Sequence, residues 1–186
     1  MAGDGTGDRA VARASAVAPA WRPGPSRVLA YADGRSAVVY ATDRGAVLLR
    51  TRSILEPVRK LAWSRDGSRL LVFAPHATRV YRNGIVVQQD DPSDATIDTD
   101  AAFVDGGRNV AANRVAGVSS NVFRIAGGPV IFSGTGVFRQ LVPSPDGHWL
   151  LVTWPTANQW VFVGQHRRKI IAVARIAQQF GRGARV

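Results

Sequence analysis

Hydrophobic and polar positions follow a pattern along this chain that repeats about every 40 residues. Each copy holds a hydrophobic stretch, a tight turn that contains glycine, and a second hydrophobic stretch. The turns of the four copies are marked by Gly24, Asp66, Gly106 and Asp146. A fixed period of this length, with strand-like content in every unit, predicts stacked β-rich repeats.

Each repeat is predicted to hold four short antiparallel strands joined by hairpin turns. In the first repeat the strands are expected at residues 14–22, 26–31, 36–42 and 45–51. In the second repeat Asn83-Gly84 lies between two apolar stretches and favours a two-residue hairpin turn. The second strand of a repeat is almost continuously apolar, as in Leu70–Phe73. This composition predicts that neighbouring sheets cover both faces of that strand.

The repeats predict an all-β chain whose sheets are arranged as the blades of a β-propeller. We expect about four blades of four antiparallel strands, as a partial or open propeller, within residues 13–176. The blades are expected at about 14–52, 58–90, 98–135 and 137–176. Residues 1–12 show no period and are expected to form a flexible tail. Residues 177–186 are expected to form a second tail or a connection to a missing blade.

Two of the repeats carry a signature that resembles a known family. Leu61-Ala-Trp-Ser-Arg-Asp-Gly-Ser-Arg-Leu-Leu-Val72 and Leu141-Val-Pro-Ser-Pro-Asp-Gly-His-Trp-Leu-Leu-Val152 look like the WD40-like repeat of TolB-type propellers. The resemblance covers about residues 14–176, although the first copy has Pro-Gly-Pro at the turn and the third has Val-Asp-Gly-Gly. It implies a propeller fold, and a location in the cell envelope or outside the cell.

Propellers of this type usually close with about six or seven blades, which is more than the four repeats of this chain. An open half-ring would leave unpaired edge strands at its ends. We therefore expect either a portion of a longer propeller or a short, divergent one. Pairing with a second copy of the chain would be another way to cover the edges.

The chain carries a net charge of +11, and all of its 24 basic residues except Lys60 and Lys169 are arginine. Such a charge favours acidic partners, including nucleic acid. The alternative is arginine at ordinary solvent-exposed positions, since the longest basic cluster is only His166–Lys169. The absence of cysteine excludes disulfides and thiolate chemistry. The sequence shows no secretory signal and no apolar run of the roughly 20 residues that cross a membrane.

Residues of catalytic and metal-binding type form no recognised motif. Five aspartates fall between Asp90 and Asp100, but their spacing differs from that of a calcium-binding EF-hand loop. A solvated loop is expected there, together with partial neutralisation of arginines such as Arg114. Ser64 and Ser144 are repeat-turn positions, and the aspartates two residues later are expected to bond backbone amides. We therefore expect a protein that is not an enzyme, with no catalytic residue, cofactor or metal site.

The tryptophans fall into two groups. Trp21 and Trp63 occupy equivalent repeat positions, which predicts packing between sheets. Three more lie in the last repeat, where they are expected to pack in a core, to lie under a further blade, or to bind a partner. The candidate interaction surface consists of Trp149, Trp154, Trp160, Asp91, Asp94 and Asp98. The candidate binding loops are 90–101, 116–121 and 154–158.

The predicted function is that of a non-enzymatic interaction module, which binds a protein partner through the loops between blades and the mouth of the channel. A rigid stack of sheets holds variable loops in fixed positions. The alternative is the propeller domain of a larger hydrolase, such as the gating domain of a prolyl-oligopeptidase-like enzyme. A third option, nucleic-acid binding through the arginines, predicts an affinity that falls steeply with salt.

Overall fold

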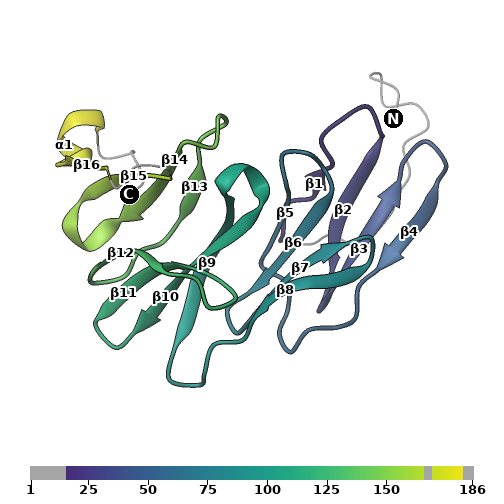
Figure 1. The fold of residues 1–186 in the computed structure, drawn as a ribbon, viewed down its shortest axis with the longest axis horizontal. Coiled ribbons are helices and arrows are strands. Elements are labelled where there is room, and N and C mark those ends of the chain that lie inside the picture. Colours follow the sequence, from purple (N-terminus) through teal and green to yellow (C-terminus); the bar gives the residue numbers. More distant parts are fainter. Residues whose placement is uncertain (1–15, 166–168, 182–186) are drawn as a thin grey trace.

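The computed structural model describes residues 16–165 and 169–181, which form four antiparallel sheets of four strands each (Figure 1). Sheet 1 contains β1 (Ala20–Trp21), β2 (Val28–Asp33), β3 (Ser36–Ala41) and β4 (Ala46–Arg50). Sheet 2 contains β5 (Lys60–Trp63), β6 (Arg69–Ala74), β7 (Ala77–Arg82) and β8 (Ile85–Asp90). Sheet 3 contains β9 (Ile97–Val104), β10 (Asn109–Ala116), β11 (Ser119–Arg124) and β12 (Val130–Thr135). Sheet 4 contains β13 (Leu141–Pro143), β14 (Trp149–Trp154), β15 (Gln159–Gly164) and β16 (Ile170–Ala174).

Within each sheet the strands pair in chain order, so every sheet is a simple meander. Three short helical segments complete the described fold: η1 (Asp105–Gly107), η2 (Pro155–Ala157) and α1 (Ile176–Phe180). The expected all-β class, with four sheets of four antiparallel strands, is confirmed. In the part of the chain that the structure covers, no helix has the length and apolar character needed to cross a membrane.

The four sheets stand side by side in chain order, with sheets 1 and 4 at opposite ends of the molecule (Figure 1). β1 and β2 contact β5, β6 contacts β9, and β9 contacts β13. Each of these contacts joins one sheet to the next in the row. Sheets 2 and 3 therefore have a neighbouring sheet on each side, while sheets 1 and 4 end the row.

Alternating side chains of the second strand of sheet 2 fill two separate cores. In β6, Leu70 and Val72 pack with side chains of sheet 1. Leu71 and Phe73 point the other way and pack with side chains of sheet 3. All four residues are at most 3% exposed. Successive side chains point to opposite faces of a strand, so a strand covered on both faces is apolar throughout. The expected coverage of this strand by two neighbouring sheets is confirmed.

The repeat turns of sheets 2 and 4 are closed by the same hydrogen bonds. Asp66 Oδ1 accepts hydrogen bonds from the Ser64 hydroxyl, at 2.6 Å, and from the Ser68 amide, at 3.1 Å. These bonds lower the pKa of Asp66 to about 2. The Asp146 carboxylate accepts the equivalent bonds from the Ser144 hydroxyl and the His148 amide. The expected bonding of both carboxylates to local backbone amides is confirmed.

Glycines of the repeat turns pack against the turn of the preceding repeat. A Cβ atom at Gly67 would lie 2.9 Å from the Pro23 carbonyl oxygen, and one at Gly107 would lie 3.1 Å from Ser64 Cβ. The same approach brings Gly147 next to the backbone of Gly106. Glycine is favoured at all three positions because φ is positive, and at Gly67 and Gly107 the neighbouring turn would also crowd a Cβ atom.

The structure corrects two of the expected loops. Residues 90–101 were expected to form a loop, but β9 begins at Ile97, and its aspartates are bonded to basic side chains as described below. Residues 116–121 were also expected to form a loop, but β11 already begins at Ser119. Residues 154–158 do connect two strands, through η2. Carboxylates can occupy a strand when a neighbouring strand or sheet supplies a basic partner, as Arg114 does for Asp98 and Lys60 for Asp100.

The two ends of the described chain also differ from the expected pattern. The first strand was expected from residue 14, whereas β1 covers Ala20–Trp21. A short helix, α1, stands where a tail or connection was expected, and its first residue, Ile176, is fully buried. The Asn158 side-chain oxygen accepts a hydrogen bond from the Ala177 amide, at 3.3 Å. The expected tail at 1–12 and the residues 182–186 lie outside the described part of the chain.

Replacing Gly107 with alanine tests the packing of one repeat turn on the next. We expect Gly117→Ala, at φ +57° in open space, to lower the free energy of unfolding by about 1 kcal/mol. Gly107→Ala adds a contact with the turn of sheet 2, and we expect a loss of roughly 2 to 3 kcal/mol. Urea-induced unfolding measures both variants. Equal losses would show that contact between the turns contributes nothing.

Candidate functional site

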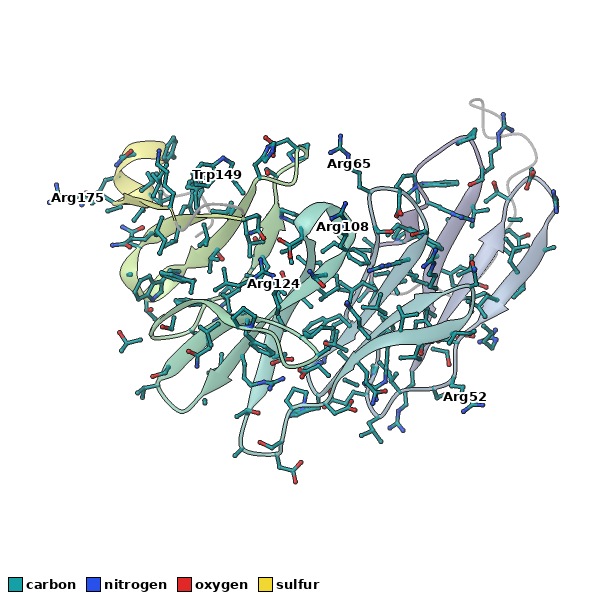
Figure 2. The ribbon with its side chains drawn as sticks, viewed as in Figure 1. Arg52, Arg65, Arg108, Arg124, Trp149 and Arg175 are labelled. Carbon is teal, nitrogen blue, oxygen red and sulfur yellow. The ribbon has the colours of Figure 1, made fainter. Side chains whose placement is uncertain are left out.

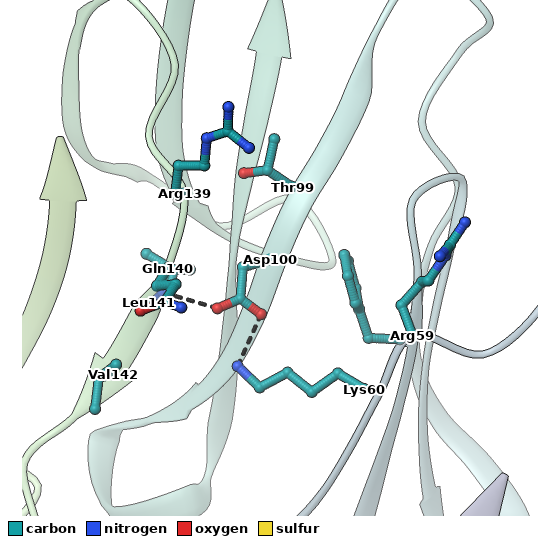
Figure 3. A pocket seen from close by; sticks show the side chains of 9 residues that line it. Arg59, Lys60, Thr99, Asp100, Arg139, Gln140, Leu141 and Val142 are labelled. Atoms are coloured by element: carbon teal, nitrogen blue, oxygen red, sulfur yellow. Dashed lines mark hydrogen bonds and ion pairs between the residues drawn. The ribbon is translucent and has the colours of Figure 1, made fainter. Parts of the chain in front are cut away.

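A groove of about 570 Å³ lies where the first strands of sheets 2, 3 and 4 come together (Figure 3). It is lined by Arg59, Lys60, Phe73, Thr99, Asp100, Arg139, Gln140, Leu141 and Val142. Most of these residues belong to β5, β9 and β13 or directly precede those strands. Three sheets therefore contribute to one concave site.

The repeat period brings these residues together. Two adjacent positions of the repeat each supply one lining residue from each of three consecutive repeats. The first position, at intervals of 40 residues, is occupied by Arg59, Thr99 and Arg139. The second is occupied by Lys60, Asp100 and Gln140. Equivalent positions of adjacent repeats lie next to one another when the repeats stack. The stacking of the sheets thus places basic side chains that are 80 residues apart in one groove.

Asp100 joins three sheets in the middle of the groove. Its Oδ1 accepts hydrogen bonds from the Lys60 ammonium of sheet 2, at 2.7 Å, and from the Ala101 amide, at 2.8 Å. Its Oδ2 accepts a hydrogen bond from the Leu141 amide of sheet 4, at 2.8 Å. Hydrogen bonds to an ionised, largely buried carboxylate are stronger than those between neutral groups. Asp100 therefore holds the first strands of sheets 2, 3 and 4 in register around the groove.

Arg59 and Arg139 also line the groove, on two sides of Asp100, with their guanidiniums directed away from its carboxylate (Figure 3). Both residues are exposed, and neither guanidinium donates a hydrogen bond to a residue that the structure describes. The ion pair of Lys60 with Asp100 is neutral, so the two guanidiniums give the groove its net charge. A guanidinium can hold a carboxylate or a phosphate through two parallel N–H groups. The groove is therefore chemically suited to an anionic group.

Two of the three candidate tryptophans of sheet 4 lie on opposite faces of that sheet. Trp154 packs in the core between sheets 3 and 4, with its ring 5.2 Å from that of Phe138. Its indole N–H donates a hydrogen bond to the Thr135 carbonyl oxygen, at 2.9 Å. Trp160 lies on the outward face and stacks on Phe180 of α1, with 5.3 Å between the ring centres.

Trp149, the third candidate tryptophan, borders a second and smaller pocket. This pocket, of about 230 Å³, lies among the repeat turns of sheets 2, 3 and 4. Trp63, Phe103, Pro143 and Gln165 also line it. The structure therefore separates the three tryptophans into a core, an outward sheet face and a pocket, and none of them lines the basic groove.

The two tryptophans at equivalent repeat positions do not share one environment. Trp63 packs against the core between sheets 1 and 2, and its indole N–H donates to the Ala20 carbonyl oxygen at 3.1 Å. The Arg22 guanidinium lies over the Trp63 ring, 5.5 Å from its centre. Trp21 is 60% exposed, so its expected packing between sheets is wrong. Sheet 1 ends the row, and Trp21 has no preceding sheet of the described chain to pack against.

The candidate aspartates also differ in their surroundings. Asp91 forms a two-bonded ion pair with Arg79, at 2.6 and 3.0 Å, and Asp94 is exposed. Asp98 is buried in β9 and accepts two hydrogen bonds from Arg114, at 2.9 and 3.2 Å. Arg114 also pairs with Asp90. These contacts agree with the expected role of the aspartates as counter-charges for Arg114, and burial keeps Asp98 away from any partner.

Burial raises the pKa of Asp98 from 3.8 to about 6, although the Arg114 guanidinium opposes this shift. Asp90, which shares the same guanidinium, raises it further. Across residues 16–165 and 169–181 no group of histidine, aspartate and glutamate side chains is placed to hold a metal ion.

Sequence reasoning did not select Arg59, Lys60 or Arg139 as site residues. Taken singly, each is one of many basic residues in a chain with 24 of them. The signal that finds them is the repeat period, because aligning the repeats at 40-residue intervals places Arg59 beside Thr99 and Arg139. The groove can therefore be found in the sequence from basic residues that recur at one repeat position, and not from the total number of basic residues.

No protein-family model and no curated protein matches this chain. The similarity of its repeat turns to the TolB-type repeat thus rests on the turn residues alone. The groove itself is defined by its geometry and charge.

Replacing Asp100 tests whether its carboxylate joins the three sheets. We expect Asp100→Ala to lower the free energy of unfolding by about 3 kcal/mol, because it leaves the Leu141 amide and the Lys60 ammonium without their acceptor. The control is Asp33→Ala, which removes an ion pair with Arg50 in which both side chains are about half exposed. That change should cost less than about 0.5 kcal/mol. Urea-induced unfolding compares the two, and similar losses would contradict the role of Asp100.

The raised pKa of Asp98 gives stability a specific pH dependence. The folded chain holds this proton more tightly than the unfolded chain, so the stabilisation is complete below about pH 3.8 and is lost as pH rises through about 6. Relative to Asp98→Asn, the unfolding free energy of the unmodified chain should therefore fall over this range, by at most about 3 kcal/mol. Urea-induced unfolding at a series of pH values compares the slopes. Parallel curves would contradict the shift.

Proposed function

We propose that this chain is a propeller-like interaction module that binds an acidic segment of a partner protein in the groove around Asp100. The observation that carries the proposal is the presence of Arg59 and Arg139, from two different sheets, in the lining of one groove. The Lys60–Asp100 pair is already neutral, so the two guanidiniums have no counter-charge among the residues that line the groove, and the Glu56 carboxylate that interacts with Arg59 lies outside that lining. An acidic side chain of a partner would supply this counter-charge.

The arrangement of the sheets supports the propeller interpretation and gives the groove its place. Four meander sheets stand in a row, and the first strands of sheets 2, 3 and 4 line the groove together. In a propeller the first strands of the blades surround a central channel. We interpret the groove as the part of such a channel that four sheets can form.

The walls of the groove favour a peptide over a nucleic acid. Val142, which is 47% exposed, adds apolar surface to the groove, while Phe73 and Leu141 are buried beneath it. A peptide that carries both acidic and apolar side chains contacts the two kinds of surface, whereas a nucleic acid needs cations in a row along its phosphates. The remaining arginines are spread over the molecule, as Arg52, Arg65 and Arg175 show (Figure 2). Among the arginines that the structure describes, Arg79, Arg114 and Arg124 are already paired with carboxylates.

The test is the binding of a fluorescein-labelled peptide rich in glutamate and leucine, measured by fluorescence anisotropy. We expect Arg59→Ala/Arg139→Ala to weaken binding at least about tenfold, since both charge-assisted contacts are lost from a partly screened site. The matched control is Arg52→Ala/Arg65→Ala, which removes the same charge from exposed positions outside the groove. It should change affinity less than about twofold.

An unlabelled oligothymidylate serves as competitor in the same assay. Displacement of the peptide only at a large excess of the oligonucleotide is the expected result. Equal weakening by the two double variants would show that binding follows net charge and not the groove. Tight, groove-independent binding of the oligonucleotide would favour nucleic acid and overturn the proposal.

A further inference from the structure

The second pocket, of about 230 Å³, lies among the repeat turns of sheets 2, 3 and 4. Three of its lining residues hold one position of the repeat, which is occupied at intervals of 40 residues by Trp63, Phe103 and Pro143. These residues stand at or next to the ends of the first strands, whereas the basic groove lies nearer the beginnings of the same strands. We name this site, which Trp149 and Gln165 also line, the turn pocket.

Gln165 borders the turn pocket with a carboxamide that has no partner. Its nitrogen and its oxygen are both buried, and neither forms a hydrogen bond with a residue that the structure describes. The main chain at this position is fixed, because the Gln165 amide donates to the His148 carbonyl oxygen at 2.8 Å. A buried polar group without a partner is costly, and native proteins hold few of them. A ligand that offers both a donor and an acceptor would remove this cost.

Trp149 departs from the role that its repeat position has in the neighbouring sheets. The equivalent residues of sheets 2 and 3 are Arg69 and Asn109, whose side chains donate hydrogen bonds to groups in the repeat turn of sheet 3. The indole N–H of Trp149 donates to no residue that the structure describes. Its side chain is partly exposed in the turn pocket. Buried tryptophans usually bond this N–H, so the Trp149 indole is open to a ligand.

The size and charge of the turn pocket indicate the class of ligand. Its volume is below the roughly 300 to 1,000 Å³ of sites for small molecules and cofactors, which suits a single side chain of a larger partner. Arg65 is the one charged residue among the described residues that line it. Two lining glycines, Gly106 and Gly147, directly follow Asp105 and Asp146. Because a nucleotide needs cations for its phosphates, these surroundings favour an uncharged ligand.

One residue of an extended peptide offers the hydrogen-bonding groups that Gln165 lacks. The N–H and C=O of a residue in an extended chain point to the same side, so that opposite residues of an antiparallel pair exchange two hydrogen bonds. A carboxamide also carries donors on its nitrogen and an acceptor oxygen. The Gln165 carboxamide can therefore exchange two hydrogen bonds with such a residue and satisfy both of its unpartnered atoms.

We propose that the turn pocket binds one apolar residue of an uncharged, extended segment of a partner protein. The side chain of that residue lies among the rings of Trp63, Phe103 and Trp149, and its backbone N–H and C=O pair with the Gln165 carboxamide. The Trp149 indole N–H donates to a neighbouring carbonyl of the segment. This site needs no acidic residue, and neither arginine of the basic groove lines it, so it is separate from the groove.

The test is isothermal titration calorimetry of the full chain with the uncharged peptide acetyl-Ser-Gly-Ser-Phe-Ser-Gly-Ser-amide. We expect one peptide to bind per chain, with a dissociation constant below about one millimolar. Replacing the phenylalanine of the peptide with alanine should weaken binding at least about tenfold, since the burial of its ring is lost. Methylation of the phenylalanine nitrogen removes the N–H that pairs with the Gln165 oxygen and should also weaken binding about tenfold.

Gln165→Leu is the matched variant of the protein. It should weaken binding of the unmethylated peptide at least about tenfold, and methylation of the peptide should then change its affinity less than about twofold. The carboxamide has no partner in the free chain, so this variant should unfold at the same or a higher urea concentration than the unmodified chain. The control is Trp21→Ala, which removes an exposed tryptophan outside the pocket and should leave binding unchanged.

Arg59→Ala/Arg139→Ala separates the two sites. It should bind the uncharged peptide as the unmodified chain does, so either proposal can fail without the other. The turn-pocket proposal is overturned if the uncharged peptide does not bind, or if methylation keeps its full effect in Gln165→Leu. Equal weakening by Trp21→Ala, or easier unfolding of Gln165→Leu, would contradict it as well. Tighter binding of adenosine than of the peptide would assign the pocket to a nucleobase and also overturn the proposal.

Discussion

The structure depends on one constraint, which is that a sheet whose second strand is apolar on both faces needs a neighbouring sheet on each side. Side chains alternate between the faces, so the apolar run Leu70–Phe73 can be buried only when a sheet lies on each side. A single repeat cannot meet this requirement. The sheets consequently stack in chain order, and the three cores of the molecule are the three contacts between neighbours.

The same stacking creates the charged groove. Equivalent repeat positions come together, and at the start of the first strands these positions are polar. Asp100 is tolerated in a buried strand because Lys60 from one neighbour and the Leu141 amide from the other satisfy its two oxygens. Arg59 and Arg139 are exposed in the lining of the groove, where water can solvate them. The repeat spacing that lets the apolar sheets pack thus also places basic side chains together in the groove around Asp100.

The sequence was sufficient to predict the four sheets, because the turns are local features. Asp66 and Asp146 accept hydrogen bonds from residues within two positions of them, so their role can be read from a short segment. Asp98 and Asp100 could not be assigned to a strand in this way. Arg114, the partner of Asp98, is its cross-strand neighbour 16 residues away in the same sheet, whereas Lys60, the partner of Asp100, is 40 residues away in another sheet and is brought close only by the packing of the sheets. The basic groove was missed for the same reason.

The local character of each sheet has a consequence for how the chain folds during its synthesis. A sheet is made from one continuous segment, so it can form as soon as that segment has left the ribosome, but its second face stays bare until the following segment emerges. The nascent chain therefore always carries one uncovered hydrophobic surface at its growing end, and each new sheet removes the surface left by the one before. A chaperone that recognises exposed apolar strands would find its binding site moving along the protein in steps of one repeat.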